Sequence, residues 1–181
     1  MTRYDSGMKH AALLRGINIG ARNRISMPEL REHLRDEGYG DVQTIVASGN
    51  IVLEATGVKP AQLEKDLQKT IAGRFGVDTP VIVRTARQMA TVVRNNPFPK
   101  AGGKDLHVLF LAERCPADAK RALEALELEP EAFEIAGRDI YCFYGSGYQN
   151  SKLAKALDKH LRKAGTDRNW NTVLKLHELL R

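Results

Sequence analysis

The residues best suited to chemistry in this sequence lie in 15–24, a stretch rich in arginine, asparagine and glycine that follows the apolar run 11–14. Its hydrogen-bond donors and its two glycines are Arg15, Asn18, Arg22, Asn23, Gly16 and Gly20. Arginine forks and closely approaching backbone N–H groups bind phosphate or carboxylate oxygens, so the stretch predicts a cradle for an anion or a nucleotide. The alternative is a long connection whose glycines make turns and whose arginines are solvated. The stretch is not a dinucleotide fingerprint, because the GxGxxG spacing is absent.

A second polar stretch, 48–50, places Ser48 and Asn50 on either side of a glycine. Both side chains can bond their own backbone, which is ordinary turn chemistry. No histidine is expected beside Ser48, so nothing marks it as a nucleophile. Ser48 and Asn50 are candidate ligand contacts, and a purely structural turn is the alternative.

The third stretch, 166–172, is the densest polar cluster of the chain and contributes Arg168, Asn169 and Asn171 as candidates. Buried asparagine and arginine are costly when unpaired, so this cluster must satisfy a neighbouring loop or face a ligand. We expect Thr166 or Asp167 to begin the last helix and Trp170 to anchor the core. The alternative role for Trp170 is a stacking surface for a base.

The charge of the chain is uneven. The net charge is +6, and 151–181 contains eight Lys or Arg against three Asp or Glu. Within the helix expected at 151–163, the lysines of one face are Lys152, Lys155, Lys159 and Lys163. This asymmetry points to a phosphate-bearing ligand or a nucleic acid as partner, and a solvated basic surface is the alternative.

Several classes of protein and site are not expected. The 181 residues contain no apolar run long enough for a membrane span and no secretory pattern at the start, so we expect a cytoplasmic protein without membrane contact. Cys115 and Cys142 lack metal-ligand spacing and read as inert thiols. The five histidines show no metal-binding spacing either, so neither a metal nor a cofactor is expected. No catalytic group can be named, and the oligomeric state stays open.

The elements that position these stretches follow from periodicity. In the first half we expect a strand at 11–14, a helix begun by a capping box at Ser26, a hairpin of strands 41–47 and 50–54, a helix from Pro60, and a strand at 79–84. The order βαββαβ is that of a ferredoxin-like module. In that topology the loop 15–24 and the turn 48–50 lie at the same edge of the sheet.

The second half repeats part of this order. After a helix at 86–94 and a stretch of helix breakers, we expect a strand at 106–111, a helix from Pro116, a hairpin at 133–144 and helices at 151–163 and 166–180. We therefore predict an α+β protein of two tandem ferredoxin-like modules, the second ending in a helix in place of its last strand. The predicted division is 1–96, a linker at 97–104, and 105–181.

Several motifs together resemble one family, the domain of unknown function 1697. They are 13–20, 48–50, 96–99, 151–153 and 166–173. The resemblance covers nearly the whole chain and implies two ferredoxin-like modules, with no established activity, substrate or cofactor. Ala21 stands where the family usually has a second glycine, and Asp167 where it usually has a hydroxyl residue, which weakens both positions as ligand contacts.

The favoured hypothesis is a protein that binds a phosphate-bearing small molecule or nucleic acid at the loop edge of the first module. Two alternatives stay open. One is an enzyme acting on a small anionic metabolite, with arginines stabilising developing charge. The other is an interaction or oligomerisation module that uses an exposed sheet or the basic helix.

Overall fold

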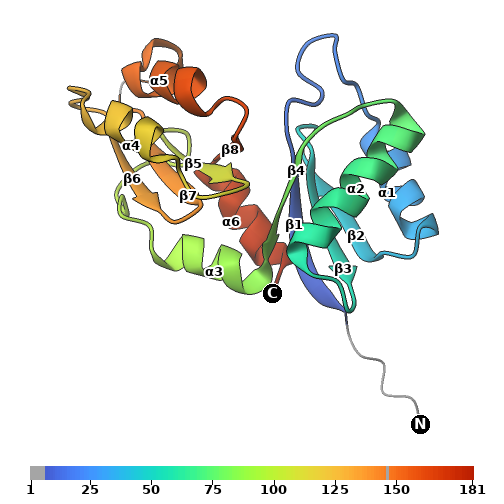
Figure 1. Ribbon diagram of the computed structural model, residues 1–181. Helices are drawn as coiled ribbons and strands as arrows, with labels where there is room; N and C mark the ends of the chain where they lie inside the picture. The colour runs from blue at the N-terminus through green and yellow to red at the C-terminus, as the bar shows by residue number, and fades with distance from the viewer. Residues whose placement is uncertain (1–6, 146) are drawn as a thin grey trace. The chain divides into compact units, whose positions relative to one another are not determined.

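The computed structural model describes residues 7–145 and 147–181, which form a mixed α+β protein with two four-stranded antiparallel sheets and six α-helices (Figure 1). The backbone contacts divide the chain into two compact units. Unit 1 covers the described residues up to Thr91 together with Leu176–Arg181, and unit 2 is Val92–Lys175. The predicted linker at 97–104 stays a prediction.

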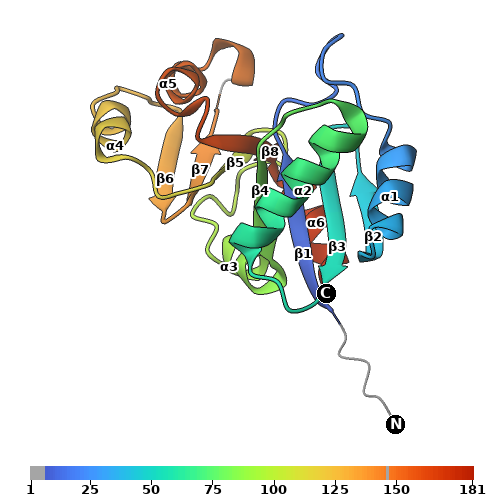
Figure 2. The same cartoon turned by 45° about the vertical axis from the view of Figure 1, so that its right-hand side comes forward.

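Unit 1 contains the first sheet, in the strand order β2-β3-β1-β4. Its elements are β1 (Met8–Leu14), α1 (Met27–Asp36), β2 (Gly40–Ile45), β3 (Asn50–Ala55), α2 (Pro60–Phe75) and β4 (Val81–Thr85), after which α3 (Ala86–Arg94) begins. Helices α1 and α2 cover one face of this sheet (Figures 1 and 2). Their apolar stripes bury Leu30 and Leu67 among others, against strand residues such as Leu53. This packing follows from apolar residues recurring every three or four positions in each helix.

Unit 2 contains the second sheet, in the order β6-β7-β5-β8. Its elements are β5 (Leu106–Leu111), α4 (Ala117–Glu124), β6 (Ala132–Ala136), β7 (Asp139–Phe143), the 3-10 turn η1 (Tyr148–Asn150), α5 (Lys152–Leu161) and β8 (Gly165–Asn169), after which α6 (Trp170–Leu179) begins. Helices α4 and α5 cover one face (Figure 2). Leu123, Leu157 and Leu111 share this core.

The helix boundaries follow local signals that the sequence contains. The Ser26 hydroxyl accepts a hydrogen bond from the backbone N–H of Glu29 at the start of α1. Gly76, with φ of +66°, ends α2 in the left-handed conformation that glycine adopts most readily. The end of α2 is as predicted, whereas only the Ser26 half of the predicted capping box is present, since the described residues show no return bond from the Glu29 carboxylate.

The end of unit 2 corrects the sequence analysis. Residues 166–169 do not open a helix; they form β8, which pairs antiparallel with β5 through partners such as Val108 and Arg168. The helix begins at Trp170, four residues later, and Asn169 provides its capping oxygen. The hydrogen-bond ladder with β5 outweighs the local capping preference of Thr166, so a fourth strand precedes the final helix.

Val46 is a second correction. We expected it to continue the alternating pattern of the strand 41–47, but β2 ends at Ile45. Val46 has φ of +47° and a side chain that is 59% exposed. The chain turns there into the tight connection to β3, which overrides the β-propensity of valine. Within the described residues, no helix is both long enough and apolar enough to cross a membrane.

Candidate functional site

Residues 15–24, which we call the arginine loop, leave β1 at the end of the first sheet where β2 turns into β3. The backbone N–H of Leu14 donates to the carbonyl of Gly49 at 2.8 Å. Arg15 is fixed through its backbone, because its N–H donates to Pro80 O at 3.2 Å and its carbonyl accepts from Thr79 Oγ1 at 2.5 Å. The arginine loop and the turn 48–50 thus meet at one end of the sheet, which confirms that part of the sequence analysis.

Asn18 is the central brace of this loop. Its Nδ2 donates to the carbonyls of Ile25, at 3.0 Å, and Ala47, at 2.6 Å, while its Oδ1 accepts from the N–H of Ile25 at 2.9 Å. The residue has φ of +54°, a conformation that asparagine tolerates better than most residues. Asn18 therefore ties the arginine loop to the β2–β3 turn and to the start of α1.

The other amide side chains near this loop also bind backbone or neighbouring groups. Asn23 Nδ2 donates to Gly16 O at 3.3 Å. Asn50 is fully buried, and its Nδ2 donates to Ile45 O and to Ser48 Oγ, each at 3.1 Å. These bonds give the candidate residues Asn23, Ser48 and Asn50 a structural role in holding the loop, and a role as ligand contacts stays a prediction.

The arginines of the loop have a different environment. Arg15 is half-buried, whereas Arg22 and Arg24 are exposed, and within the described residues none of the three side chains forms an ion pair or hydrogen bond. Arg24 lines a shallow hollow of about 550 Å³. The other lining residues are Asn18, Gly20, Ile25, Ser26, Met27, Pro28 and Ala47. A braced loop with open guanidinium groups can bind an anion through paired N–H donors.

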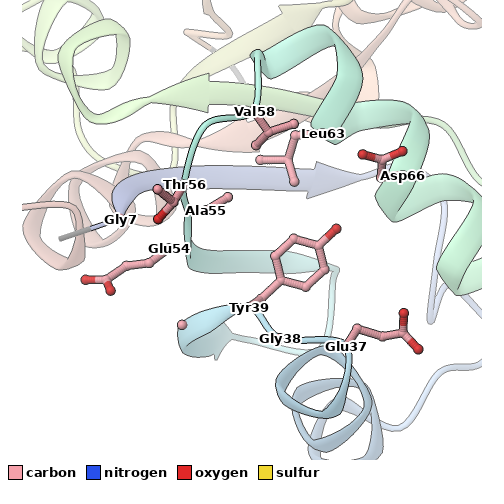
Figure 3. A pocket seen from close by; sticks show the side chains of 11 residues that line it. Gly7, Glu37, Gly38, Tyr39, Glu54, Ala55, Thr56, Val58, Leu63 and Asp66 are labelled. Carbon is pink, nitrogen blue, oxygen red and sulfur yellow. The ribbon is translucent and has the colours of Figure 1, made fainter. Parts of the chain in front are cut away.

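The opposite end of the same sheet has the opposite charge. A hollow of about 610 Å³ lies where β1 begins and β3 ends, and Figure 3 shows the Tyr39 ring flanked by Asp66 and Glu37, with Glu54 nearby. Burial, together with these Asp66 and Glu37 carboxylates, raises the pKa of the Tyr39 hydroxyl. These carboxylates make the hollow unfavourable for an anion, in contrast to the arginine loop at the other end of the sheet.

The remaining candidates, Arg168, Asn169 and Asn171, belong to unit 2. Arg168 is 8% exposed, and its Nη1 donates to Thr166 Oγ1 and to the carbonyl of Asp167, both at 2.7 Å. Burial lowers the pKa of Arg168 to about 10, against the opposing effect of Asp167, so the guanidinium stays charged at neutral pH. Arg168 therefore has a packed environment, unlike the arginines of the loop.

Asn169 and Asn171 lie on either side of Trp170, which is 9% exposed and thus buried as predicted. Asn169 Oδ1 accepts from the N–H of Thr172 at 2.9 Å and caps α6. The side chain of Asn171 lies so close to Gly103 that any Cβ at that position would overlap it. These contacts are structural, and a ligand-binding role for the pair stays a prediction.

The start of α5 is occupied by an internal carboxylate. Glu131 is buried and accepts from the N–H groups of Lys152, at 3.1 Å, and Leu153, at 2.8 Å, and from the Ser151 hydroxyl at 3.1 Å. A helix N-terminus favours a negative charge, and Glu131 provides it. The glycine-containing turn before α5 therefore does not present this helix end to a phosphate.

One polar pair was missed from the sequence. His107 Nδ1 lies 2.6 Å from Asp167 Oδ2, across the pairing of β5 with β8. The assignment of Asp167 to a helix hid this pair, because only the strand register places the two side chains side by side. The β8 residues, Gly165–Asn169, show no alternation of apolar and polar side chains, so no local signal pointed to the strand or to the pair.

The geometry of His107 favours its charged form. Its Nε2 lies 3.2 Å from the carbonyl oxygen of Lys104, which can only accept a hydrogen bond. An ionised carboxylate also only accepts, so this arrangement favours the charged imidazole, in which both ring nitrogens carry a proton. Burial alone lowers the pKa of His107, but Asp167 and Lys104 O outweigh it and raise the pKa overall. With both nitrogens occupied, His107 has no free site for general-base catalysis.

Both cysteines favour the less reactive thiol form. Cys142 is fully buried, and burial raises the pKa of its thiol well above the ordinary value, as it also raises that of Cys115. In 7–145 and 147–181, no group of three or more His, Cys, Asp or Glu side chains is arranged to hold a metal ion.

Comparison with known proteins places the chain among uncharacterised ones. A family model described as "Protein of unknown function (DUF1697)" matches residues 8–141. A search of curated proteins finds no match. A solved structure of the conserved bacterial protein SP0830 from Streptococcus pneumoniae is similar, with a TM-score of 0.80 and 26% sequence identity. The match covers 96% of this chain and 99% of that protein.

Proposed function

The chain belongs to the DUF1697 family of proteins of unknown function, and we propose that it binds a phosphate-bearing ligand at the arginine loop. The observation that carries this proposal is the contrast between bound amides and open arginines. The side chain of Asn18 forms hydrogen bonds to backbone groups, whereas Arg22 and Arg24 are exposed on the braced loop. A rigid loop loses little conformational entropy when it binds, which favours affinity.

The ligand class follows from the chemistry of the loop. Guanidinium groups bind the oxygens of phosphate in pairs, and two glycines with positive φ, Gly16 and Gly20, leave the backbone uncovered by Cβ atoms. A small phosphorylated metabolite and a nucleic-acid backbone share this chemistry. Their salt dependences differ, because each additional phosphate contact releases counterions and steepens the loss of affinity with salt.

The test is a triple variant, Arg15→Ala, Arg22→Ala and Arg24→Ala, compared with the unaltered chain at low salt. Binding of pyrophosphate is measured by calorimetry, and binding of a fluorescein-labelled 12-nucleotide oligomer by anisotropy. We expect affinity for at least one probe to fall about tenfold or more, because charge-assisted hydrogen bonds are lost. A shallow salt dependence would identify the small ligand, and a steep one the nucleic acid.

The matched control removes three positive charges elsewhere in unit 1, by changing Lys65, Lys69 and Arg87 to alanine. All three side chains are exposed. A replacement of the three loop arginines by lysine keeps the charge but loses the planar fork, so its affinity should fall between the other two. Equal affinities for the unaltered chain and the triple loop variant would refute the proposal.

The same proposal includes a ferredoxin-like topology for each unit and a cytoplasmic location. The support for the topology is the strand order, with the first and third strands of each sheet paired antiparallel at its centre. An enzyme is the second candidate, since the loop arginines could also stabilise a developing negative charge. A screen of phosphatase, transferase and nuclease substrates that stays negative would remove that candidate.

A further inference from the structure

We propose that unit 2 carries a separate surface for single-stranded nucleic acid, in which Tyr148 stacks on an unpaired base and the lysines of α5 contact the flanking phosphates. The proposal does not rest on the arginine loop. It rests on a fixed aromatic ring that is open on one side and on the basic helix that follows it directly in the chain. Such a combination is typical of proteins that grip single strands without reading their sequence.

The ring of Tyr148 packs against two other aromatic rings. It stacks on the ring of His107, with centroids 5.7 Å apart and planes inclined by 19°. The buried ring of Tyr144 meets it edge-on at 5.1 Å. His107 is itself fixed by Asp167 and by the carbonyl of Lys104. The platform is therefore ordered before any ligand arrives, which lowers the entropic cost of stacking.

The other side of Tyr148 faces solvent. The residue is 53% exposed, one of the few large apolar side chains of the described residues with that much open surface. An exposed tyrosine whose inner face already packs on other rings offers its outer face to one further aromatic group. A nucleic-acid base fits this position, because every base has a flat π-face and stacking does not depend on sequence.

The helix beyond this platform supplies the positive charge. Lys152, Lys155 and Lys159 recur at three- and four-residue spacing and are exposed, while the apolar residues of α5 point into the core. Burial and the carboxylates of Asp167 and Asp158 raise the pKa of the Tyr148 hydroxyl, and Asp158 also pairs with Arg162 at 3.6 Å. The amide groups at the helix start already bind Glu131, so phosphates would be held by lysine side chains.

The platform favours a single strand over a duplex or a membrane. Bases within a duplex are stacked on each other and cannot cover Tyr148. The leucines of α5 are buried, so the helix has no apolar face for insertion into lipid. Affinity should therefore follow the presence of unpaired bases.

The experiment uses the whole chain and a fluorescein-labelled dT12 strand, with anisotropy measured from 20 to 200 mM salt. Tyr148→Ala and Tyr148→Leu should weaken binding about 5- to 100-fold, and Tyr148→Phe should bind like the unaltered chain, since a ring is what stacking requires. Lys155→Ala with Lys159→Ala should reduce the slope of log K against log salt by about 1.4, from two lost phosphate contacts. Lys65→Ala with Lys69→Ala, the same spacing on exposed α2 positions, is the control and should leave the slope unchanged.

Three outcomes would overturn this inference: no binding of dT12 at low salt, equal binding by Tyr148→Ala and the unaltered chain, or equal affinity for dT12 and for heparin with no effect of substituting Tyr148.

The triple arginine variant of the loop separates this surface from the proposed function. If the three arginine substitutions leave dT12 binding intact while Tyr148→Ala weakens it, the surface in unit 2 stands and dT12 is not the ligand of the loop. The reverse pattern would reject the surface and retain the loop. Circular dichroism at each variant's binding temperature establishes that it is folded.

Discussion

Arg84 and Arg168 occupy the same register position in the last strands of the two sheets. Arg84 in β4 pairs with Ala11 of β1, and Arg168 in β8 pairs with Val108 of β5. Both arginines are buried, and each donates from Nη1 to the carbonyl of the residue before it. A shared buried arginine with a shared hydrogen bond indicates that the two units repeat at the level of single residues.

The junction after each arginine repeats as well. In unit 1, the Thr85 hydroxyl accepts from the N–H of Gln88 at 3.2 Å at the start of α3. In unit 2, Asn169 Oδ1 accepts from the N–H of Thr172 at the start of α6. The residue types differ, but an oxygen-bearing side chain three residues before the bonded amide is common to both. The two units therefore follow the same plan up to the first turns of α3 and α6.

Gly49 should be intolerant of any side chain. It has φ of +77°, and a methyl group built on it would lie 2.7 Å from Cβ of Leu14 and 2.8 Å from the side chain of Ile17. Gly49→Ala combines overpacking with a strained backbone, and we expect it to lower the free energy of unfolding by about 2–5 kcal/mol. Urea denaturation measures this loss.

Gly57 provides the matched control for that substitution. It also has positive φ, +68°, but a methyl group there meets no atom within 4 Å. Gly57→Ala should therefore cost only about 1 kcal/mol, from backbone strain alone. Equal losses at the two positions would show that the contact of Gly49 with Leu14 and Ile17 does not matter.

The surroundings of Gly49 also show which features of the fold and site could be predicted from the sequence. The turn at 48–50 and its approach to the arginine loop follow from alternating strands and from topology, so both were predictable. The bonds of Asn18 to Ile25 and Ala47 were not, because an asparagine in a loop has the same local pattern whether it binds a ligand or the backbone. Likewise, β8 was hidden because its partner strand lies about 55 residues earlier in the chain, beyond the range of local propensity.

Asn18 should hold the loop in shape through its hydrogen bonds, and its role as a ligand contact stays a prediction. Asn18→Ala removes the hydrogen bonds to Ile25 and Ala47 and leaves an alanine at positive φ, so we expect a loss of about 2 kcal/mol in the free energy of unfolding. It should also weaken phosphate binding, because the loop is no longer held in shape. Thermal denaturation and pyrophosphate calorimetry measure the two effects.

Asn23→Ala is the comparison for Asn18. Asn23 also has positive φ, +51°, so both alanine variants carry the same backbone strain. Asn23 is exposed and its side chain makes one long bond, at 3.3 Å to Gly16 O, so Asn23→Ala should cost about 1 kcal/mol less than Asn18→Ala. Asn18→Gly removes the backbone strain, because glycine tolerates positive φ, but it does not restore the lost hydrogen bonds. Its stability should lie between those of the two alanine variants. A neutral effect of Asn18→Ala would contradict a bracing role.

Glu131 should be a strong determinant of the stability of unit 2. Glu131→Gln replaces a buried acceptor-only group by an amide whose NH2 faces the N–H donors at the start of α5, so we expect a loss of about 2–3 kcal/mol. Chemical denaturation measures it. Glu129→Gln, at an exposed position two residues earlier, serves as the control and should change stability by less than about 0.5 kcal/mol. Similar stabilities of the two variants would mean that Glu131 is dispensable.

The pKa of His10 should be shifted down and that of His107 up, although the two residues hold equivalent positions in β1 and β5. His10 Nδ1 lies 2.7 Å from the carbonyl oxygen of Met8, and its buried Nε2 has no hydrogen-bond partner among the described residues, so the ring is neutral. Burial lowers the pKa of His10, against the weaker effect of Met8 O. Nuclear magnetic resonance of the ring protons against pH should show one titration below and one above the ordinary value of 6.5.

The stability of the fold should depend on pH through His107. Its folded pKa is raised, so its stabilising effect is complete below about pH 6.5, the unfolded value, and is lost as pH rises through the folded pKa. His107→Gln carries no charge and should lower the free energy of unfolding by about 1.5–3 kcal/mol at pH 5.5 but much less at pH 9. Urea unfolding at the two values measures this difference. His160→Gln, at an exposed position of α5, is the control. If the His107 variant lost as much stability at pH 9 as at pH 5.5, a neutral ring would be holding Asp167, and the doubly protonated state would be wrong.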